Sequence, residues 1–136
     1  MIGTYFLFLY WPSFNSAVAE GSAKLRAAIN SVLSLTASTV SALLVSLIVH
    51  GKLDVEILLN STLAGGVAMG AAADLVVKPY YALIAGWATG AISALGYTHI
   101  GPFLAKRIGL HDTCGIHNLH GIPGIIGSVI AAITVN

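Results

Sequence analysis

The stretch from Ala27 to Gly51, AAINSVLSLTASTVSALLVSLIVHG, contains 25 residues and no Asp, Glu, Lys or Arg. Four other stretches also lack these residues: Met1–Ala19, Ile57–Ala73, Pro79–Ala105 and Thr113–Asn136. A helix that crosses the hydrocarbon core of a bilayer needs about 20 apolar residues, with a range of about 17–25. Barrel strands would show alternating polarity, which these stretches lack. The sequence therefore predicts an all-α, polytopic membrane helix bundle with five transmembrane helices.

The five helices are expected at about residues 1–19, 27–50, 56–74, 79–105 and 112–135, in one transmembrane domain over residues 1–136. Short charged connections separate them, so no soluble domain is expected. Met1 enters the first apolar stretch without a charged flank, and Asn136 directly follows the last one. We therefore expect the chain to be an internal part of a longer polypeptide.

The composition excludes several classes of function. Hydrophobic residues make up 57% of the chain and charged residues 8%, whereas about a quarter of the residues in a soluble domain are charged. A formal net charge of +1 argues against nucleic-acid binding, which needs a basic surface. The single cysteine, Cys114, excludes a disulfide framework. The sequence has no Gly-x-Ser-x-Gly, His-Glu-x-x-His or nucleotide-binding motif, so we expect neither an enzyme nor a cofactor.

One side of the second expected helix carries small polar residues that mostly recur three or four positions apart. They are Asn30, Ser31, Ser34, Ser38 and Ser41. Because this spacing places them on one helix face, we expect the face to contact other helices. A hydroxyl group there can bond across to a neighbour or back to its own helix. Glycines at residues 65, 66, 70, 86 and 90 also predict close helix packing.

The stretch His111–Gly124, HDTCGIHNLHGIPG, carries candidate functional residues. Asp112 suits the N-cap of the last expected helix, because its carboxylate can accept backbone N–H bonds at the positive end of the helix dipole. His120 follows eight residues later, which is about 12 Å along a helix axis. That depth places an imidazole near the middle of the bilayer, where an ionisable side chain marks a candidate functional site.

Three interpretations of His120 stay open from the residues alone. The first is a neutral, hydrogen-bonded contact between helices. The second is a metal site that combines His120 with His111, Cys114 and His117, but their spacing matches no common zinc motif, so we expect no metal. The third is a proton-handling site in a conduction path, which suits imidazole because its ordinary pKa is about 6.5.

The alternation of the spans places Phe14 and Asp54. Phe14 lies six residues before Glu20, or about 9 Å inside one membrane surface. Asp54 belongs to a connection on the opposite surface, which also carries Asp112. Phe14 is thus expected near one mouth of a path, His120 near its middle and Asp54 at the other mouth. Packing against lipid or core is the alternative for Phe14, and capping of the third helix is the alternative for Asp54.

Several stretches resemble the Rh glycoproteins of the ammonium transporter superfamily. They are MIGT at residues 1–4, WPSFNSA at residues 11–17, TLAGGVA at residues 62–68 and the stretch His111–Gly124. The resemblance implies the sixth to tenth helices, roughly the second half, of an eleven- or twelve-helix fold around a narrow hydrophobic pore. It also implies a homotrimer with one pore per subunit, embedded in the lipid bilayer of the plasma membrane.

The resemblance assigns roles to individual residues. His120 matches the second of two pore histidines, with Ile116 on the adjoining wall. Phe14 matches a phenylalanine that gates the outer end of the pore, and Asp54 matches an acidic residue of the cytoplasmic vestibule. Asp112 matches the acidic start of the histidine helix and is expected to be structural. The first pore histidine and the other gate phenylalanine belong to helices that precede this part of the fold.

The implied function is passive, bidirectional conduction of ammonia or ammonium through a hydrophobic pore that contains a histidine. Two alternatives stay open. The first is a channel for carbon dioxide, which the same dry pore would serve. The second is a structural homologue or ammonium sensor that does not transport.

Overall fold

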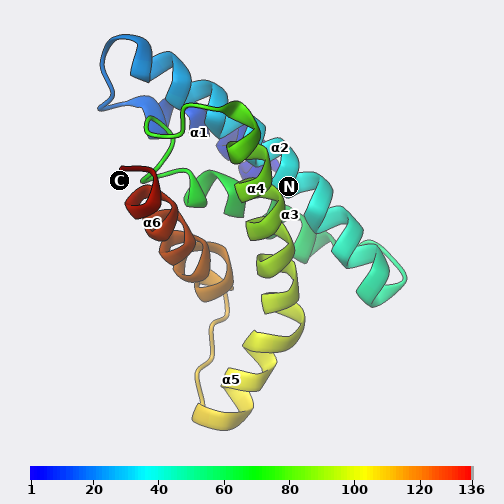
Figure 1. Cartoon of the computed structure of the whole chain (residues 1–136). Coiled ribbons are helices and arrows are strands. Elements are labelled where there is room, and N and C mark those ends of the chain that lie inside the picture. The colour runs from blue at the N-terminus through cyan, green and yellow to red at the C-terminus, as the bar shows by residue number, and fades with distance from the viewer. Residues whose placement is uncertain (136) are drawn as a thin grey trace.

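The computed structural model describes residues 1–135, which form a bundle of helices without a β-strand (Figure 1). The α-helices are α1 (Ile2–Ser16), α2 (Gly21–His50), α3 (Val55–Ala68), α4 (Pro79–Leu95), α5 (Gly101–Ile108) and α6 (Ile122–Val135). Two short π-helices, η1 (Gly96–Ile100) and η2 (His117–Gly121), lead directly into α5 and α6. The predicted all-α fold is confirmed. By length and composition, α2 and the segment His117–Val135 could each cross a membrane.

The long helix α2 runs along one side of the bundle and packs against α1, α3 and α4 (Figure 1). The helices approach closely at Ser34, whose backbone lies against Gly65 of α3 and Gly86 of α4. A Cβ atom on Gly86 would lie 2.6 Å from the Ser34 Cα, and one on Gly65 would lie 2.8 Å from the Ser34 carbonyl carbon. Only glycine permits these approaches, which explains the glycine-rich stretches.

The polar face of α2 is buried among these helices, as the spacing predicted. The Ser34 hydroxyl donates to the Gly65 carbonyl at 2.8 Å, and the Ser38 hydroxyl donates to the Ser61 carbonyl at 2.6 Å. Ser31 instead donates to the Ala27 carbonyl of its own helix at 2.8 Å. These hydroxyl groups are therefore satisfied in apolar surroundings, and two of them connect α2 to α3.

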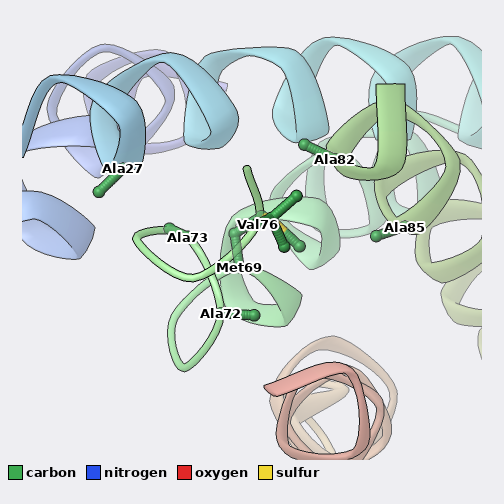
Figure 2. Close-up of a cluster of buried hydrophobic side chains, with 7 residues drawn as sticks. All are labelled: Ala27, Met69, Ala72, Ala73, Val76, Ala82 and Ala85. Carbon is green, nitrogen blue, oxygen red and sulfur yellow. The ribbon is translucent and has the colours of Figure 1, made fainter. Parts of the chain in front are cut away.

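A core of small apolar side chains lies between α2, α4 and the connection that follows α3 (Figure 2). Its buried members are Ala27, Met69, Ala72, Ala73, Val76, Ala82 and Ala85. In Figure 2, Met69 and Val76 lie between the segments that carry Ala27 and Ala82. Because most of the members are alanines, the backbones of these segments can approach closely.

The third helix is shorter than the sequence predicted. It ends at Ala68, whereas the expected helix continued to residue 74. The Asn30 side chain of α2 donates to the backbone carbonyls of Ala73 and Val76, at 2.9 and 2.7 Å. Carbonyl groups beyond the end of a helix need partners outside that helix, and Asn30 supplies them here, so it holds the turn after α3 against α2.

Four other bounds also differ from the expected ones: two helices extend further than expected, and two helical segments are shorter. α2 begins at Gly21 rather than residue 27, and α5 ends at Ile108 rather than residue 105. Lysine, arginine, alanine and leucine are good helix formers, so these helices continue past the charge-free stretches. α1 ends at Ser16 rather than residue 19, and the last helical segment begins at His117 rather than residue 112. The absence of charge thus indicates depth in the membrane, not the ends of a helix.

Candidate functional site

His120 lies in the last turn of η2, directly before α6. Asp112 fixes the start of this segment, because its carboxylate oxygens accept backbone N–H bonds from Ile116 at 2.9 Å and His117 at 2.7 Å. The neighbouring Leu119 is buried in an apolar cluster. His120 itself is exposed within this chain. The segment therefore anchors Leu119 in the core and directs the imidazole away from it.

Two aromatic side chains of α1, Trp11 and Phe14, lie near His120. The Trp11 indole and the His120 imidazole are nearly parallel, with 6.5 Å between the ring centroids and 18° between the ring planes. The Phe14 ring lies 6.4 Å from the Trp11 ring at an angle of 61°. The fold thus brings together three rings from opposite ends of the sequence.

These rings line a cavity of about 360 Å³, which we call the aromatic cavity. Its lining residues are Leu7, Trp11, Phe14, Asn15, Gly66, Val67, Gly70 and His120. Most of these residues are apolar, and the imidazole of His120 is a polar group among them. A largely apolar lining with a few placed polar groups is typical of small-molecule sites.

Asn15 holds the α1 side of the aromatic cavity in place. Its amide donates to the Ser31 hydroxyl of α2 at 2.9 Å and to the Gly66 carbonyl of α3 at 3.0 Å. Gly66 also leaves room for Trp11, since a Cβ atom there would lie 2.7 Å from the indole nitrogen. Hydrogen bonds and close packing therefore fix the wall of this cavity to two other helices.

The structure brings together two of the residues that the sequence proposed for the path. Phe14 and His120 both line the aromatic cavity. Ile116 is exposed near the start of η2, four residues before His120, and does not line this cavity. Asp112 is bonded to the backbone ahead of η2, which is the structural role expected of it.

A second cavity, of about 240 Å³, lies between α3, η1, α5 and the connection before η2, and we call it the acidic cavity. Glu56 and Asp112 contribute carboxylates to its lining, and neither lysine nor arginine is present there. His111 and Tyr97 also line it. The Tyr97 hydroxyl donates to the Gly115 carbonyl at 2.9 Å, which ties η1 to the connection before η2.

Asp54 has a capping role next to the acidic cavity. Its Oδ1 accepts N–H bonds from Glu56 at 3.0 Å and Ile57 at 3.1 Å, and it is the N-cap of α3. Its own N–H donates to the Ser46 hydroxyl at 2.8 Å. Glu56 lines the acidic cavity, whereas Asp54 does not. The contacts of Asp54 are therefore those of a helix cap, which was the alternative to a vestibule role.

The metal interpretation finds no support in the described part of the chain. No group of three His, Cys, Asp or Glu side chains within residues 1–135 could hold a metal ion. Cys114 is exposed, and its sulfur lies 4.0 Å from the Thr113 hydroxyl. His117 has its ring nitrogen 3.4 Å from the amide oxygen of Asn118. The four residues of the metal interpretation thus do not form a ligand cluster.

Sequence reasoning missed two residues of these cavities, Trp11 and Glu56. Trp11 lies three positions before Phe14, so helical spacing could have placed both rings on one face. Glu56 lies in the first turn of α3. An acidic residue is common in the first turn of a helix, because the helix dipole stabilises its charge. The position of Glu56 in the sequence therefore did not indicate a cavity.

The fold and the aromatic cavity define a polytopic helical membrane protein with an aromatic site beside a histidine. The model of the Ammonium Transporter Family matches residues 1–136. The chain therefore belongs to the ammonium transporter family.

Relatives within this family agree with the resemblance to Rh glycoproteins, which is confirmed. The chain is 53% identical to the ammonium transporter Rh type C of Oryctolagus cuniculus, over 98% of this chain and 29% of that protein. It is also 53% identical to the Homo sapiens Rh type C transporter, with the same coverage. The chain thus spans about three tenths of the length of these relatives, a smaller share than the expected half.

Solved structures of the family share the fold. The structure described as "Nitrosomonas europaea Rh50 and mechanism of conduction by Rhesus protein family of channels" matches with a TM-score of 0.93 and 37% identity, over 97% of this chain and 35% of that chain. The structure described as "Sensor Amt Protein" matches with a TM-score of 0.83 and 26% identity, over 97% of this chain and 32% of that chain.

Proposed function

We propose that the full-length protein conducts ammonia or ammonium across the plasma membrane and that this chain supplies part of the pore wall. The observation that carries the proposal is the aromatic cavity, in which Phe14, Trp11 and His120 lie beside one another. The Rh type C relatives are named ammonium transporters, which supports this substrate. As the resemblance implies, the working unit is a homotrimer in the lipid bilayer with Phe14 toward the outside.

In this proposal, the species that crosses the apolar part of the path is neutral ammonia. An ammonium ion that enters a dry cavity loses its hydration, at a cost of several kcal/mol or more. Release of its proton at the mouth removes this charge before the narrow part of the path. The neutral molecule then needs only a few polar contacts, and the ring nitrogens of His120 could supply them.

Phe14 and Ile116 border this path in the proposal. The Phe14 side chain is 67% exposed within this chain and Ile116 is 57% exposed. These exposed apolar side chains lie on the same face of the chain as His120. Other helices of the full-length protein would cover this face. Phe14 would close the outer end of the pore, and Ile116 would continue its apolar wall beyond His120.

The first test compares flux in the full-length protein and in its His120→Ala variant. We expect maximal methylammonium or ammonia flux in proteoliposomes to fall by about a hundredfold or more, because one positioned proton-transferring group contributes about a hundredfold to ten-thousandfold. His99→Ala is the matched control, because His99 is exposed on η1 and lines neither cavity.

Each contrary outcome of this test supports another function. Parent flux that His120→Ala leaves unchanged would overturn the histidine pathway and favour a plain pore for a gas such as carbon dioxide. A full-length protein without flux would overturn the transport proposal and favour a structural homologue or an ammonium sensor.

We further propose that the inner mouth owes its attraction for cations to Glu56 more than to Asp54. The Glu56 side chain is exposed and lines the acidic cavity, whereas one carboxylate oxygen of Asp54 is engaged with the backbone of α3. An uncompensated carboxylate at a mouth raises the local concentration of a cation. This assignment gives Glu56 the vestibule role that the resemblance gave to Asp54.

Glu56→Gln should therefore raise the inner ammonium concentration needed for half-maximal flux, by about twofold to fivefold. Asp54→Asn should leave both this concentration and the yield of folded protein nearly unchanged, because the amide oxygen of asparagine can still cap α3 and the lost charge has no role in the proposal. Flux from each side of oriented vesicles measures both effects. Glu20→Gln removes one charge from the opposite end of α2 and is the control. An equal shift in Asp54→Asn and none in Glu56→Gln would return the role to Asp54.

A further inference from the structure

The two π-helices, η1 and η2, are each a single wide turn, and they pack against one another. In η1 the Gly101 N–H donates to the Gly96 carbonyl, five residues earlier. In η2 the Ile122 N–H donates to the His117 carbonyl with the same spacing. Turns of this kind are rare and occur frequently at functional sites. His120 belongs to the second turn, so the direction of its imidazole depends on the wide form of η2.

The Asn118 side chain of η2 fits against the turn of η1. Asn118 is buried, and a Cβ atom on Gly96 would lie 2.9 Å from its amide carbon. A Cβ atom on Gly101 would lie 3.5 Å from its amide nitrogen. Gly96 and Gly101 are the two residues whose backbone bond closes η1. A side chain from one π turn therefore packs directly against the residues that close the other.

Tyr97 of η1 holds the point at which η2 begins. Its hydroxyl donates to the Gly115 carbonyl at 2.9 Å. The same carbonyl accepts the backbone N–H of Asn118 at 3.1 Å and that of Leu119 at 3.0 Å, which are bonds at the start of η2. Gly115 has a φ of +64°, and a Cβ atom there would overlap the Tyr97 ring. The Tyr97 side chain thus fixes the carbonyl from which η2 starts, and only glycine leaves room for it.

We propose that Tyr97 and Asn118 are positioning residues that act through His120, by holding η2 in the wide turn that directs the imidazole to the aromatic cavity. This inference rests on the proposed function of that cavity. Both residues line the acidic cavity instead, so their effect on the aromatic cavity passes through η2. An α-helix turns by about 100° per residue. If η2 closed as an α-helix, the residues before Ile122 would turn by about this angle relative to α6, and His120 would face elsewhere.

The first variant is Gly96→Ala in the full-length protein, which separates the two turns but keeps both Tyr97 and Asn118. Its Cβ atom would meet the Asn118 side chain. We expect maximal ammonia flux in proteoliposomes to fall by about tenfold to a hundredfold, because a displacement of about 1 Å in a working group can cost a hundredfold. The half-saturating ammonium concentration should stay nearly unchanged, because Glu56 still attracts the cation at the inner mouth. His99→Ala is the control in η1, because His99 is exposed and lines neither cavity.

Tyr97→Phe tests the same contact more mildly and replaces Gly96→Ala if that variant does not fold. It keeps the aromatic ring and removes one hydroxyl bond, that to the Gly115 carbonyl. Maximal flux should fall by about twofold to tenfold, the change in an equilibrium that the loss of one hydrogen bond causes. Tyr81→Phe is the matched control, because it removes a hydroxyl near the start of α4, at the far end of the same helical segment.

Electron cryomicroscopy of the full-length parent and variants in lipid nanodiscs separates positioning from a general packing role. Positioning predicts that the bond from Ile122 to the His117 carbonyl is lost and the His120 imidazole is turned wherever flux is reduced. Unchanged maximal flux in a folded Gly96→Ala variant, or reduced flux with an unmoved imidazole, would overturn the inference while leaving the transport proposal intact. A parent without flux would overturn the transport proposal. The maps would then decide whether the two turns hold each other, and an imidazole unmoved in Gly96→Ala would overturn that as well.

Discussion

The Gly86→Ala variant of the full-length protein should be recovered as folded protein in only a small fraction of the parent yield. Its Cβ atom would lie 2.6 Å from the Cα of Ser34, and a Cα atom cannot move aside as a flexible side chain can. The helices α2 and α4 would have to separate, and this separation would also weaken the contact of α2 with Gly65 of α3. Overpacking a tight core costs about 1–3 kcal/mol and occasionally more. Yield after size-exclusion chromatography and the midpoint of thermal unfolding measure the loss.

Gly124→Ala is the control for this substitution. A Cβ atom on Gly124 would have nothing within 4 Å. Alanine favours helix over glycine by about 1 kcal/mol, so this variant should match the parent or exceed its stability. A Gly86→Ala variant with parental yield and midpoint would show that α2 and α4 do not touch through their backbones at this point.

The sequence predicted five helical segments, and the structure contains five when α4, η1 and α5 are taken as one continuous segment and η2 with α6 as another. This was predictable because bilayer thickness imposes a minimum length on each apolar stretch. The bounds were less predictable, since helix propensity and hydrogen bonding decide them. α2 begins at Gly21, in a charged turn that forms helix readily. α3 ends at Ala68, and the turn that follows it is bonded by Asn30 of α2. A contact between residues 43 positions apart cannot be read from local periodicity.

The candidate site was predictable to a similar degree. Depth in the membrane singled out His120, and the resemblance added Phe14, which lines the same cavity. Trp11, which neighbours both, lies three positions before Phe14, a spacing that places the two on one helix face. It has no charge or unusual chemistry that would mark it as a candidate. Asp54 has the carboxylate expected of a vestibule residue, but it stands at the start of α3, where its carboxylate caps the helix. Residue type alone could not separate these two uses of a carboxylate.

The Asn30→Leu variant should lower the stability of the full-length protein by about 2–6 kcal/mol, since each of two buried carbonyls left without a partner costs about 1–3 kcal/mol. The Asn30 side chain is 1% exposed, and its amide serves two carbonyls, those of Ala73 and Val76. Those carbonyls belong to the turn that places Met69 and Val76 in the core of Figure 2. Loss of the amide therefore removes the bonds that hold this core connection against α2. The midpoint of unfolding in a denaturing detergent measures the effect.

Asn30→Asp and Asn60→Ala complete this test. The carboxylate of Asn30→Asp has nearly the shape of the amide but cannot donate when ionised, so this variant should be at least as unstable as Asn30→Leu. The Asn60 amide donates only within its own helix, to the Glu56 carbonyl at 3.1 Å, and its loss should change stability by about 0.5 kcal/mol or less. If Asn30→Leu and Asn30→Asp both kept the parental midpoint, packing rather than hydrogen bonding would hold the turn after α3.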